Sequence, residues 1–456
     1  MVRTTVAAAD PETRRLRLIA AELEAVDGTP PGPEAPLSKH QKMARSPFRF
    51  FRGSAQLFYA DLAMGTVVMP EALAAAPLTR VQGDCHFANF GFLTEEGSHG
   101  DAVIWCPNDY DDACVGRAGW DLLRFSVSLF LAAEHAVGLC RGSYALDDPD
   151  DDVPAGIAPS AADARAAVLA FAAAYGATCA ATATDPDERD RAVRGFDKDH
   201  ALGKAERKAR KRTAGGKDFA EKSTLAKATE MRDGALRFRI APGRYDPLPD
   251  DEAAAVAAAF RPYVDDAVLD VVRRVGAGTG SVDVDRFYLL VGPGADEPER
   301  LYLNHIVEVK RQRRAAPLRH FPDIDPANRL DSAHLTVDCQ RLMQRRPDIV
   351  LDEAEWRGHH WLVRSRHHAR VSLDPDDLIC KHPDRFIAEY AAACGDALAL
   401  AHARGDRRSV DFEAAMAAAL SDEATRAALA DTAAAYAGRV TADWTLLRAL
   451  LSPASD

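Results

Sequence analysis

The chain has two polar segments, Gln82-Gly83-Asp84-Cys85-His86-Phe87-Ala88-Asn89 and Asn108-Asp109-Tyr110-Asp111-Asp112-Ala113, with a strand-like apolar run between them. The first contains an Asp and, five residues later, an Asn; the second places three carboxylates within four positions. Such carboxylates repel one another unless they are solvated or bind a cation. Together the segments supply what a phosphoryl-transfer site needs: one carboxylate to orient a nucleophile, and an amide and further carboxylates to hold Mg²⁺.

Each segment also has a simpler interpretation. An Asp after Gly commonly forms a turn, and an acidic run is commonly a solvated surface turn. The spacing from Asp84 to Asn89 equals the D-x-x-x-x-N of kinase catalytic loops, in which the Asp accepts the substrate proton and the Asn binds metal. That spacing alone arises often by chance. The acidic segment that follows it is what favours a catalytic site.

The composition is that of a soluble globular protein: 456 residues, 47% hydrophobic and 28% charged. A net charge of −12 argues against a nucleic-acid partner, which would favour a basic protein. Eight cysteines form no C-x-x-C pair, so neither zinc fingers nor a disulfide framework is indicated, and reduced thiols in the cytoplasm are the simplest interpretation. The most apolar run, residues 122–137, contains Arg124 and Glu134 and is predicted to be a buried helix; no membrane association is expected.

The two segments resemble the catalytic and metal loops of aminoglycoside and choline kinases. Residues 83–89 are similar to their H-G-D-L-H-x-x-N loop, with Gln82 in place of the first His, and Asp109 to Leu122 fall in register with their I-D-W-x-x-A-x-x-G-x-x-x-x-D-L block. The resemblance makes Asp84 the catalytic base and Asn89 and Asp109 the Mg²⁺ ligands. It makes Asp121 a structural acid that braces the loop. Asp111 could substitute for Asp109 as a metal ligand.

The chain as a whole is more similar to a bacterial family known as domain of unknown function 2252 (DUF2252), itself regarded as kinase-like. The matching pieces run from about residue 40 to the C-terminus: Ser46-Pro47-Phe48 with Phe51-Arg52-Gly53, the two polar segments, Gly278-Thr279-Gly280-Ser281 with Arg286-Phe287, Lys310, Gln340-Arg341-Leu342, Val363-Arg364, and Cys394-Gly395 to Ala401-His402-Ala403. The resemblance implies an α+β, two-lobed, protein-kinase-like fold with a large helical lobe and a smaller antiparallel-sheet lobe. It implies no particular substrate.

A kinase also needs a Gly-rich turn over the nucleotide phosphates and a Lys that reaches them. Too little chain precedes Asp84 for such a lobe, whereas Gly278, Gly280, Ser281 and the strand residue Lys310 come after it. The helix that ends near His402 resembles the L-A-x-L-H helix that normally leads into the catalytic loop. These observations predict a circular permutation. The departures are Asp283, where relatives have a third glycine, and Arg311, where they have an acidic residue.

This organisation divides the chain into four parts. Residues 1–36 are an N-terminal helix and linker, and residues 37–195 are the first part of the helical lobe with the catalytic and metal loops. Residues 196–380 are the nucleotide-covering β-rich lobe, and residues 381–456 are helices that complete the helical lobe. Within the third part, the pattern predicts a long helix over 253–275 and strands over 287–291 and 301–310.

Further candidates lie outside the two segments. Arg364 is predicted to be a site residue that clamps a phosphate or carboxylate. Two histidine pairs, 359–360 and 367–368, could bind metal, but neighbouring strand residues point to opposite faces and a surface role is favoured.

The function expected from this set is an ATP- and Mg²⁺-dependent phosphotransferase that acts on a small hydroxylated or amino-bearing metabolite. One alternative is a kinase-like nucleotide-binding protein that transfers AMP or has no catalytic activity, which Asp283 and Arg311 favour. Another is a metal-dependent phosphoesterase, suggested by Gly-Asp-x-His and the clustered aspartates. The chain lacks the companion Asp-x-His and Gly-Asn-His segments that such an esterase needs, so this alternative ranks low.

Overall fold

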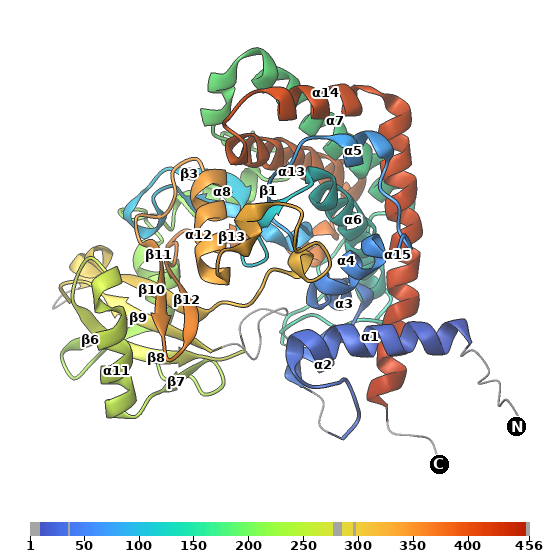
Figure 1. Cartoon of the computed structure of the whole chain (residues 1–456). Helices are drawn as coiled ribbons and strands as arrows, with labels where there is room; N and C mark the ends of the chain where they lie inside the picture. The colour runs from blue at the N-terminus through green and yellow to red at the C-terminus, as the bar shows by residue number, and fades with distance from the viewer. Residues whose placement is uncertain (1–9, 35–36, 149, 277–284, 295–297, 453–456) are drawn as a thin grey trace, which may run out of the picture.

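A large helical lobe stands beside a smaller lobe rich in antiparallel strands (Figure 1). The computed structural model describes residues 10–34, 37–148, 150–276, 285–294 and 298–452. The expected α+β class, with a helical lobe and antiparallel sheets, is therefore confirmed.

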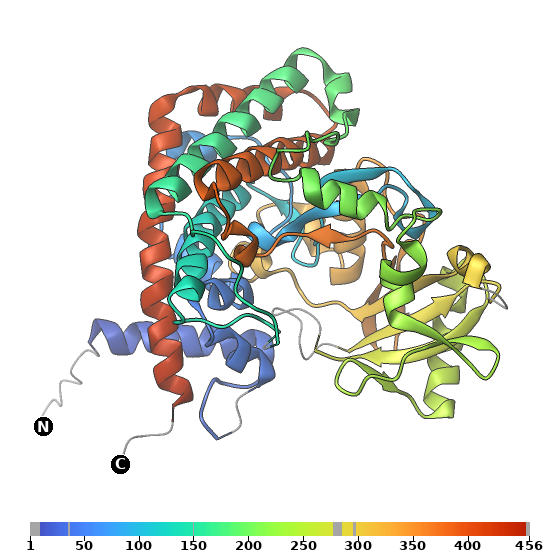
Figure 2. The same cartoon turned by 180° about the vertical axis from the view of Figure 1, so that it is seen from behind.

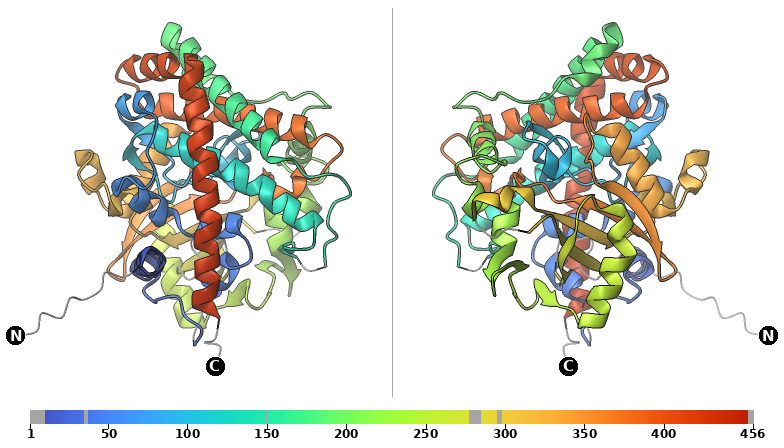
Figure 3. Two further views of the ribbon diagram at one scale, coloured as in Figure 1. Left: turned by 90° about the vertical axis from the view of Figure 1, so that its right-hand side faces the viewer. Right: turned by 90° about the vertical axis from the view of Figure 1, so that its left-hand side faces the viewer.

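The helical lobe combines both ends of the chain around one hydrophobic core. Its helices are α1 (Pro11–Asp27), α2 (Ser38–Met43), α3 (Pro47–Gly53), α4 (Ala55–Ala63), α5 (Glu71–Ala75), α6 (Ala118–Cys140), α7 (Ala161–Thr184), α13 (Pro383–Gly405), α14 (Asp411–Ser421) and α15 (Glu423–Leu451). The helix α15 runs along one side of the lobe, and α7 lies beside α13 (Figures 2 and 3). Arg15 of α1 pairs with Asp61 of α4 and with Asp443 of α15, so an ion-pair network ties the N-terminal helix to the C-terminal one.

Two helices of this lobe, α6 and α7, are long and apolar enough to cross a membrane by length and composition alone. In α6, 83% of the most apolar window is buried inside the protein, as predicted for a core helix. The corresponding share in α7 is 50%, and this helix packs against α13 and α14. Packing within the lobe thus accounts for much of their apolar character.

The smaller lobe is built on a six-stranded antiparallel sheet with apolar cores on both faces. Its strands, in spatial order, are β11 (Leu351–Trp356), β12 (His359–Ser365), β10 (His305–Arg311), β9 (Arg286–Val291), β8 (Val268–Arg274) and β7 (Tyr245–Pro247). One face packs on the hairpin of β5 (Thr229–Arg232) and β6 (Ala235–Phe238) with α9 (Phe219–Lys222) and α10 (Thr224–Ala228), and the other packs on α11 (Asp250–Phe260). Because both faces are covered, β9 is buried along its whole length.

Two small sheets pack into the core of the helical lobe and hold the polar segments. One pairs β1 (Thr79–Val81) with β4 (Cys114–Gly116), and the other has the order β13 (Val371–Ser372), β2 (Phe90–Thr94) and β3 (Val103–Pro107). Two further helices are α8 (Gly203–Arg210) and α12 (Ser332–Met343). The first polar segment therefore follows β1, and the second connects β3 to β4.

The helix predicted over 253–275 is wrong in its second half. Helix α11 ends at Phe260, two residues before Pro262, and residues 268–274 form strand β8. Proline disfavours helical backbone in the residue before it and donates no hydrogen bond. The Val-rich stretch beyond it pairs with β9, where β-branched side chains pack well. The strands expected over 287–291 and 301–310 correspond to β9 and β10, although residues 298–303 are a 3₁₀ helix.

Candidate active site

The first polar segment is held by the buried carboxylate of Asp121, near the start of α6. The backbone N–H groups of Gln82 and Gly83 donate hydrogen bonds to its two oxygens, at 2.6 and 3.0 Å. His402 Nε2 lies 3.1 Å from the same carboxylate, and the His402 ring contacts the Tyr175 hydroxyl through Nδ1 at 2.8 Å. The loop is thus fixed from three elements distant in sequence.

The C-terminal end of α13 lies against β1, the strand that leads into this loop (Figure 1). The Thr79 hydroxyl donates a hydrogen bond to the His402 carbonyl at 2.7 Å, and the Arg80 guanidinium donates one to the Gly405 carbonyl at 2.9 Å. A helix near the end of the sequence therefore stands directly beside the start of the catalytic-loop candidate.

The two polar segments touch at a glycine. Gly83 has φ +78°, a conformation that L side chains rarely adopt, and an added Cβ would lie 1.9 Å from the Asp112 carbonyl oxygen. The Gln82 side chain donates to the carbonyl of Asp109 at 2.8 Å and to that of Asn89 at 3.2 Å. Glycine at position 83 therefore permits the approach of the two segments, and Gln82 ties them together.

Asp84 lies at the tip of the first segment and is paired with Arg124 of α6. Arg124 donates to Asp84 Oδ1 from Nε at 2.7 Å and lies 2.5 Å from it through Nη2. Burial raises the pKa of Asp84 to about 7, although Arg124 opposes this shift. The Asp84 side chain keeps 16% of its surface exposed, whereas that of Arg124 is fully buried.

Arg124 was not predicted as a site residue. The available signal was a charged residue within a strongly apolar helix, a position where an unpaired cation would be costly.

The three aspartates of the second segment differ in their surroundings. Asp112 accepts from the backbone of Ala316 at 2.7 Å and from Arg313 at 3.0 Å, so it serves the packing of the segment. Asp111 Oδ1 is buried without a hydrogen-bond partner. Burial, and then the charge of Asp111, raises the pKa of Asp109. Burial also disfavours the charge of Asp111, but Lys310 and Arg364 hold its pKa well below its usual value.

Lys310 reaches these carboxylates from the central strand β10. Its side chain is 3% exposed and its ammonium group forms an ion pair with Asp111 Oδ2. Gln312, next but one along the chain, donates to the Asp111 carbonyl at 2.7 Å. Burial lowers the pKa of Lys310, while Asp111 and Asp109 favour its charged form. The structure thus brings together a strand lysine and an acidic segment 199 residues apart.

Beside Lys310, the fully buried Glu308 gathers three arginines. Arg364 Nε donates to Glu308 Oε2 at 2.9 Å, and Arg286 and Arg366 approach Oε1 at 3.3 and 3.7 Å. Burial alone would raise the pKa of Glu308, but these cations hold it well below its usual value. The charge of Arg364 also acts on Asp109 and Asp111. Arg364, the predicted phosphate or carboxylate clamp, therefore lies near the aspartates of the second segment. Its guanidinium group is already paired with the carboxylate of Glu308.

The remaining predicted residues are placed as follows. Asn89 ends a 3₁₀ turn, and its side-chain Nδ2 donates a hydrogen bond to the Asp84 carbonyl at 2.9 Å. This hydrogen bond does not involve the side-chain oxygen of Asn89, which is the atom that a cation would bind. Gly278, Gly280 and Ser281, with Asp283, lie outside the described residues. Arg311 is exposed at the end of β10.

The donor set suits a hard divalent cation beside a polyanion. Asp109 and Asp111 supply carboxylate oxygens, one of them buried and without a hydrogen-bond partner, and Mg²⁺ prefers such ligands. Lys310, Arg364 and Arg370 all act electrostatically on Asp109. Cations placed around two carboxylates are what a metal-bound phosphate chain requires.

The comparisons with known proteins identify a family and no function. A family model described as "Uncharacterized protein conserved in bacteria (DUF2252)" matches residues 32–139 and 156–450. No curated protein and no solved structure matches the chain.

Proposed function

The chain belongs to the DUF2252 family of uncharacterized bacterial proteins, and we propose that it is an ATP- and Mg²⁺-dependent phosphotransferase with a small-molecule acceptor. The observation that carries the proposal is the contact between Lys310 and Asp111. A buried lysine of one lobe meets an acidic segment held by the other lobe, and Asp84 projects from the adjoining loop. Such an arrangement has the parts that phosphoryl transfer uses.

Each side chain has a defined part in this proposal. Asp109 and Asp111, with Asn89, hold Mg²⁺, which neutralises charge on the phosphates. Lys310 and Arg364 bind phosphate oxygens; Gly278, Gly280 and Ser281, which the sequence predicts to form the phosphate-covering turn, lie outside the described residues. Asp84 takes the proton of the acceptor hydroxyl group while the oxygen of that hydroxyl group bonds to the γ-phosphorus. The bond between that phosphorus and the bridging oxygen breaks, and ADP leaves.

The proposal includes a kinase-like fold in circularly permuted order. Two features support it: α13 ends beside the strand leading to Asp84, and the Lys-bearing sheet follows the catalytic loop in sequence. In this arrangement the helix that usually precedes the catalytic loop corresponds to α13, which is encoded after the Lys-bearing sheet.

Loss of Asp109 is expected to abolish Mg²⁺-dependent ATP binding. Loss of a residue that only supports a metal ligand weakens metal binding by roughly 10–100-fold. Loss of a direct ligand such as Asp109 should weaken binding by more than this. Calorimetric titration of Asp109→Ala with ATP, with and without Mg²⁺, measures this. Asp101→Ala removes an exposed carboxylate just before β3 and is the matched control. Equal affinities for Asp109→Ala and the unmodified protein would overturn the metal assignment.

The ion pair between Asp84 and Arg124 favours a second candidate, a kinase-like nucleotide-binding protein that transfers AMP or does not catalyse a reaction. Single-turnover incubation with γ-labelled and α-labelled ATP separates these possibilities. Label leaving from the γ-position as phosphate or phosphorylated acceptor supports the phosphotransferase. Retention of the α-label on an acceptor with release of pyrophosphate identifies AMP transfer, and binding without turnover identifies a non-catalytic site.

The rate is expected to follow the ionisation of Asp84. A general base acts only when deprotonated, and the pKa of Asp84 is raised to about 7. Hydrolysis of γ-labelled ATP should therefore be maximal above neutral pH and fall about tenfold per pH unit below it. The single-turnover rate measured between about pH 5 and pH 9 gives this pH dependence. The residual rate of Asp84→Asn should no longer change with pH in this way. A profile unchanged by that substitution would assign the titration to another group.

A further inference from the structure

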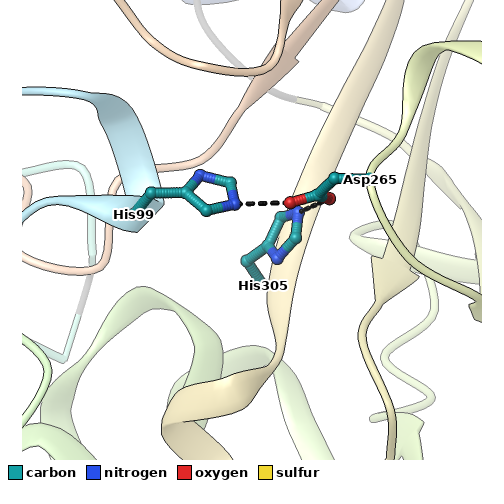
Figure 4. A group of neighbouring side chains, drawn as sticks. All are labelled: His99, Asp265 and His305. Carbon is teal, nitrogen blue, oxygen red and sulfur yellow. Dashed lines mark hydrogen bonds and ion pairs between the residues drawn. The ribbon is translucent and has the colours of Figure 1, made fainter.

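Two histidines and an aspartate meet at the contact between the β2–β3 hairpin and the six-stranded sheet (Figure 4). His99 Nε2 lies 2.6 Å from Asp265 Oδ2, and His305 Nε2 lies 3.1 Å from Asp265 Oδ1. The two imidazole rings are 4.8 Å apart between centroids. One ligand atom from each residue thus falls within 4.8 Å of the others.

The three residues come from separate elements. His99 ends the 3₁₀ turn Gly97–His99 between β2 and β3, Asp265 precedes β8, and His305 is the first residue of β10. Neighbouring contacts hold the hairpin in place: the Ser98 N–H donates to Ser365 Oγ at 3.3 Å. The cluster therefore forms across a fixed junction.

His305 has an unused nitrogen in this junction. The residue is 6% exposed, and although Nε2 is close to the Asp265 carboxylate, it makes no hydrogen bond of acceptable geometry. A buried imidazole nitrogen that makes no hydrogen bond is available to bind a metal ion.

We propose that His99, Asp265 and His305 bind a divalent transition metal of the zinc class. Two imidazole nitrogens and one carboxylate oxygen form a ligand set that such borderline ions prefer, with a coordination position left for water or a further ligand. Bound metal would join the hairpin that follows the first polar segment to the sheet that carries Lys310.

This site is separate from the proposed Mg²⁺ site. His305 and Lys310 are five residues apart on β10, about 17 Å by the rise of an extended strand. The ligands also differ in kind, since Mg²⁺ prefers oxygen donors and rarely takes imidazole. Failure of either site would leave the other untouched.

A second group, Asp331, His334 and Glu353, provides a built-in comparison. It has one imidazole, and Asp331 already caps α12 by accepting from the His334 backbone at 2.9 Å. His334 itself pairs with Glu353 at 2.6 Å and keeps 49% of its side chain exposed. These contacts account for the group as a helix cap and surface ion pairs, so no metal is assigned to it.

The test is a calorimetric titration of Zn²⁺ into the full-length protein after treatment with a chelator. One Zn²⁺ per chain is expected, with an affinity that His99→Ala lowers by at least about tenfold and that His334→Ala leaves unchanged. His99 is exposed at the surface, so its replacement should preserve the fold. Zn²⁺ should raise the melting temperature of the unmodified protein and of His334→Ala but not of His99→Ala.

Asp265→Asn gives a second, independent variant, and the visible spectrum of bound Co²⁺ reports the coordination itself. Loss of the Co²⁺ band in His99→Ala and in Asp265→Asn would support the assignment. Absence of Zn²⁺ binding in the unmodified protein, equal binding by His99→Ala, or loss of binding only in His334→Ala would each overturn it.

Discussion

Asp84→Asn is expected to slow the release or transfer of the γ-phosphate by about 10²–10⁴-fold, the contribution of a positioned general base. Asparagine keeps the size of the side chain and an oxygen that can accept from Arg124, but it cannot take a proton. Affinity for ATP and Mg²⁺ should stay close to that of the unmodified protein, because Lys310, Asp109 and Asp111 are untouched. Single-turnover hydrolysis of γ-labelled ATP, with calorimetric ATP binding alongside, measures both quantities.

Because Asp84 forms an ion pair with Arg124, it has either a structural or a catalytic role, and this experiment distinguishes the two. If Asp84 has only a structural role, the substitution should alter the melting temperature and leave any turnover unaltered. If Asp84 is the base, turnover should collapse while the nucleotide still binds. Asp101→Asn, a change of the same chemistry at an exposed position, should alter neither quantity. Full turnover by Asp84→Asn would remove Asp84 from the proposed chemistry.

Glu308→Gln is expected to lower the free energy of unfolding by about 3–5 kcal/mol, the usual cost of removing one partner from a buried ion pair. Glu308 is completely buried, and Arg286, Arg364 and Arg366 surround it. A neutral amide would leave these cations without their shared counter-charge inside the protein. Chemical denaturation of the two proteins measures the difference, and Glu355→Gln on the exposed side of β11 should change stability by less than about 0.5 kcal/mol.

The free energy of unfolding that Glu308→Gln loses should also depend on pH. Surrounding cations lower the folded-state pKa of Glu308 below its usual value of 4.5. The stability that this shift contributes is therefore present above about pH 4.5 and is lost as the pH falls toward the folded-state pKa. The difference in free energy of unfolding between Glu308→Gln and the unmodified protein should become smaller on acidification. A difference that becomes larger in acid would show that Glu308 is protonated at neutral pH.

Local patterns were sufficient to predict β9 and β10 and to single out the two polar segments, but not β8. The segment around Asp84 and the acidic segment after it stand out because they combine glycine, carboxylates and amides between apolar strands. The close approach of Lys310 to Asp111 also follows the prediction that the later sheet faces the earlier loops. Alternation and turn chemistry act over a few residues, so such features can be recognised without knowledge of the tertiary structure.

Features that depend on tertiary neighbours were missed or mistaken. Nothing near Glu308 in the sequence indicates that three arginines from other positions surround it, and Arg124 shows its role only once α6 packs beside the first segment. The surface role favoured for the pair 367–368 is wrong, because His368 is almost fully buried. His99 and His305 belong to no motif, and the fold alone brings them together.

The junction between α13 and β1 has a consequence for how the protein is made. Asp121 meets His402 across 281 residues of sequence, so a ribosome has exposed the whole strand-and-loop region long before it produces the helix that braces it. Until α13 has been synthesised, the nascent chain carries these loops without that support. Bracing of the first polar segment is therefore a late step in folding, and a product truncated before α13 would lack it.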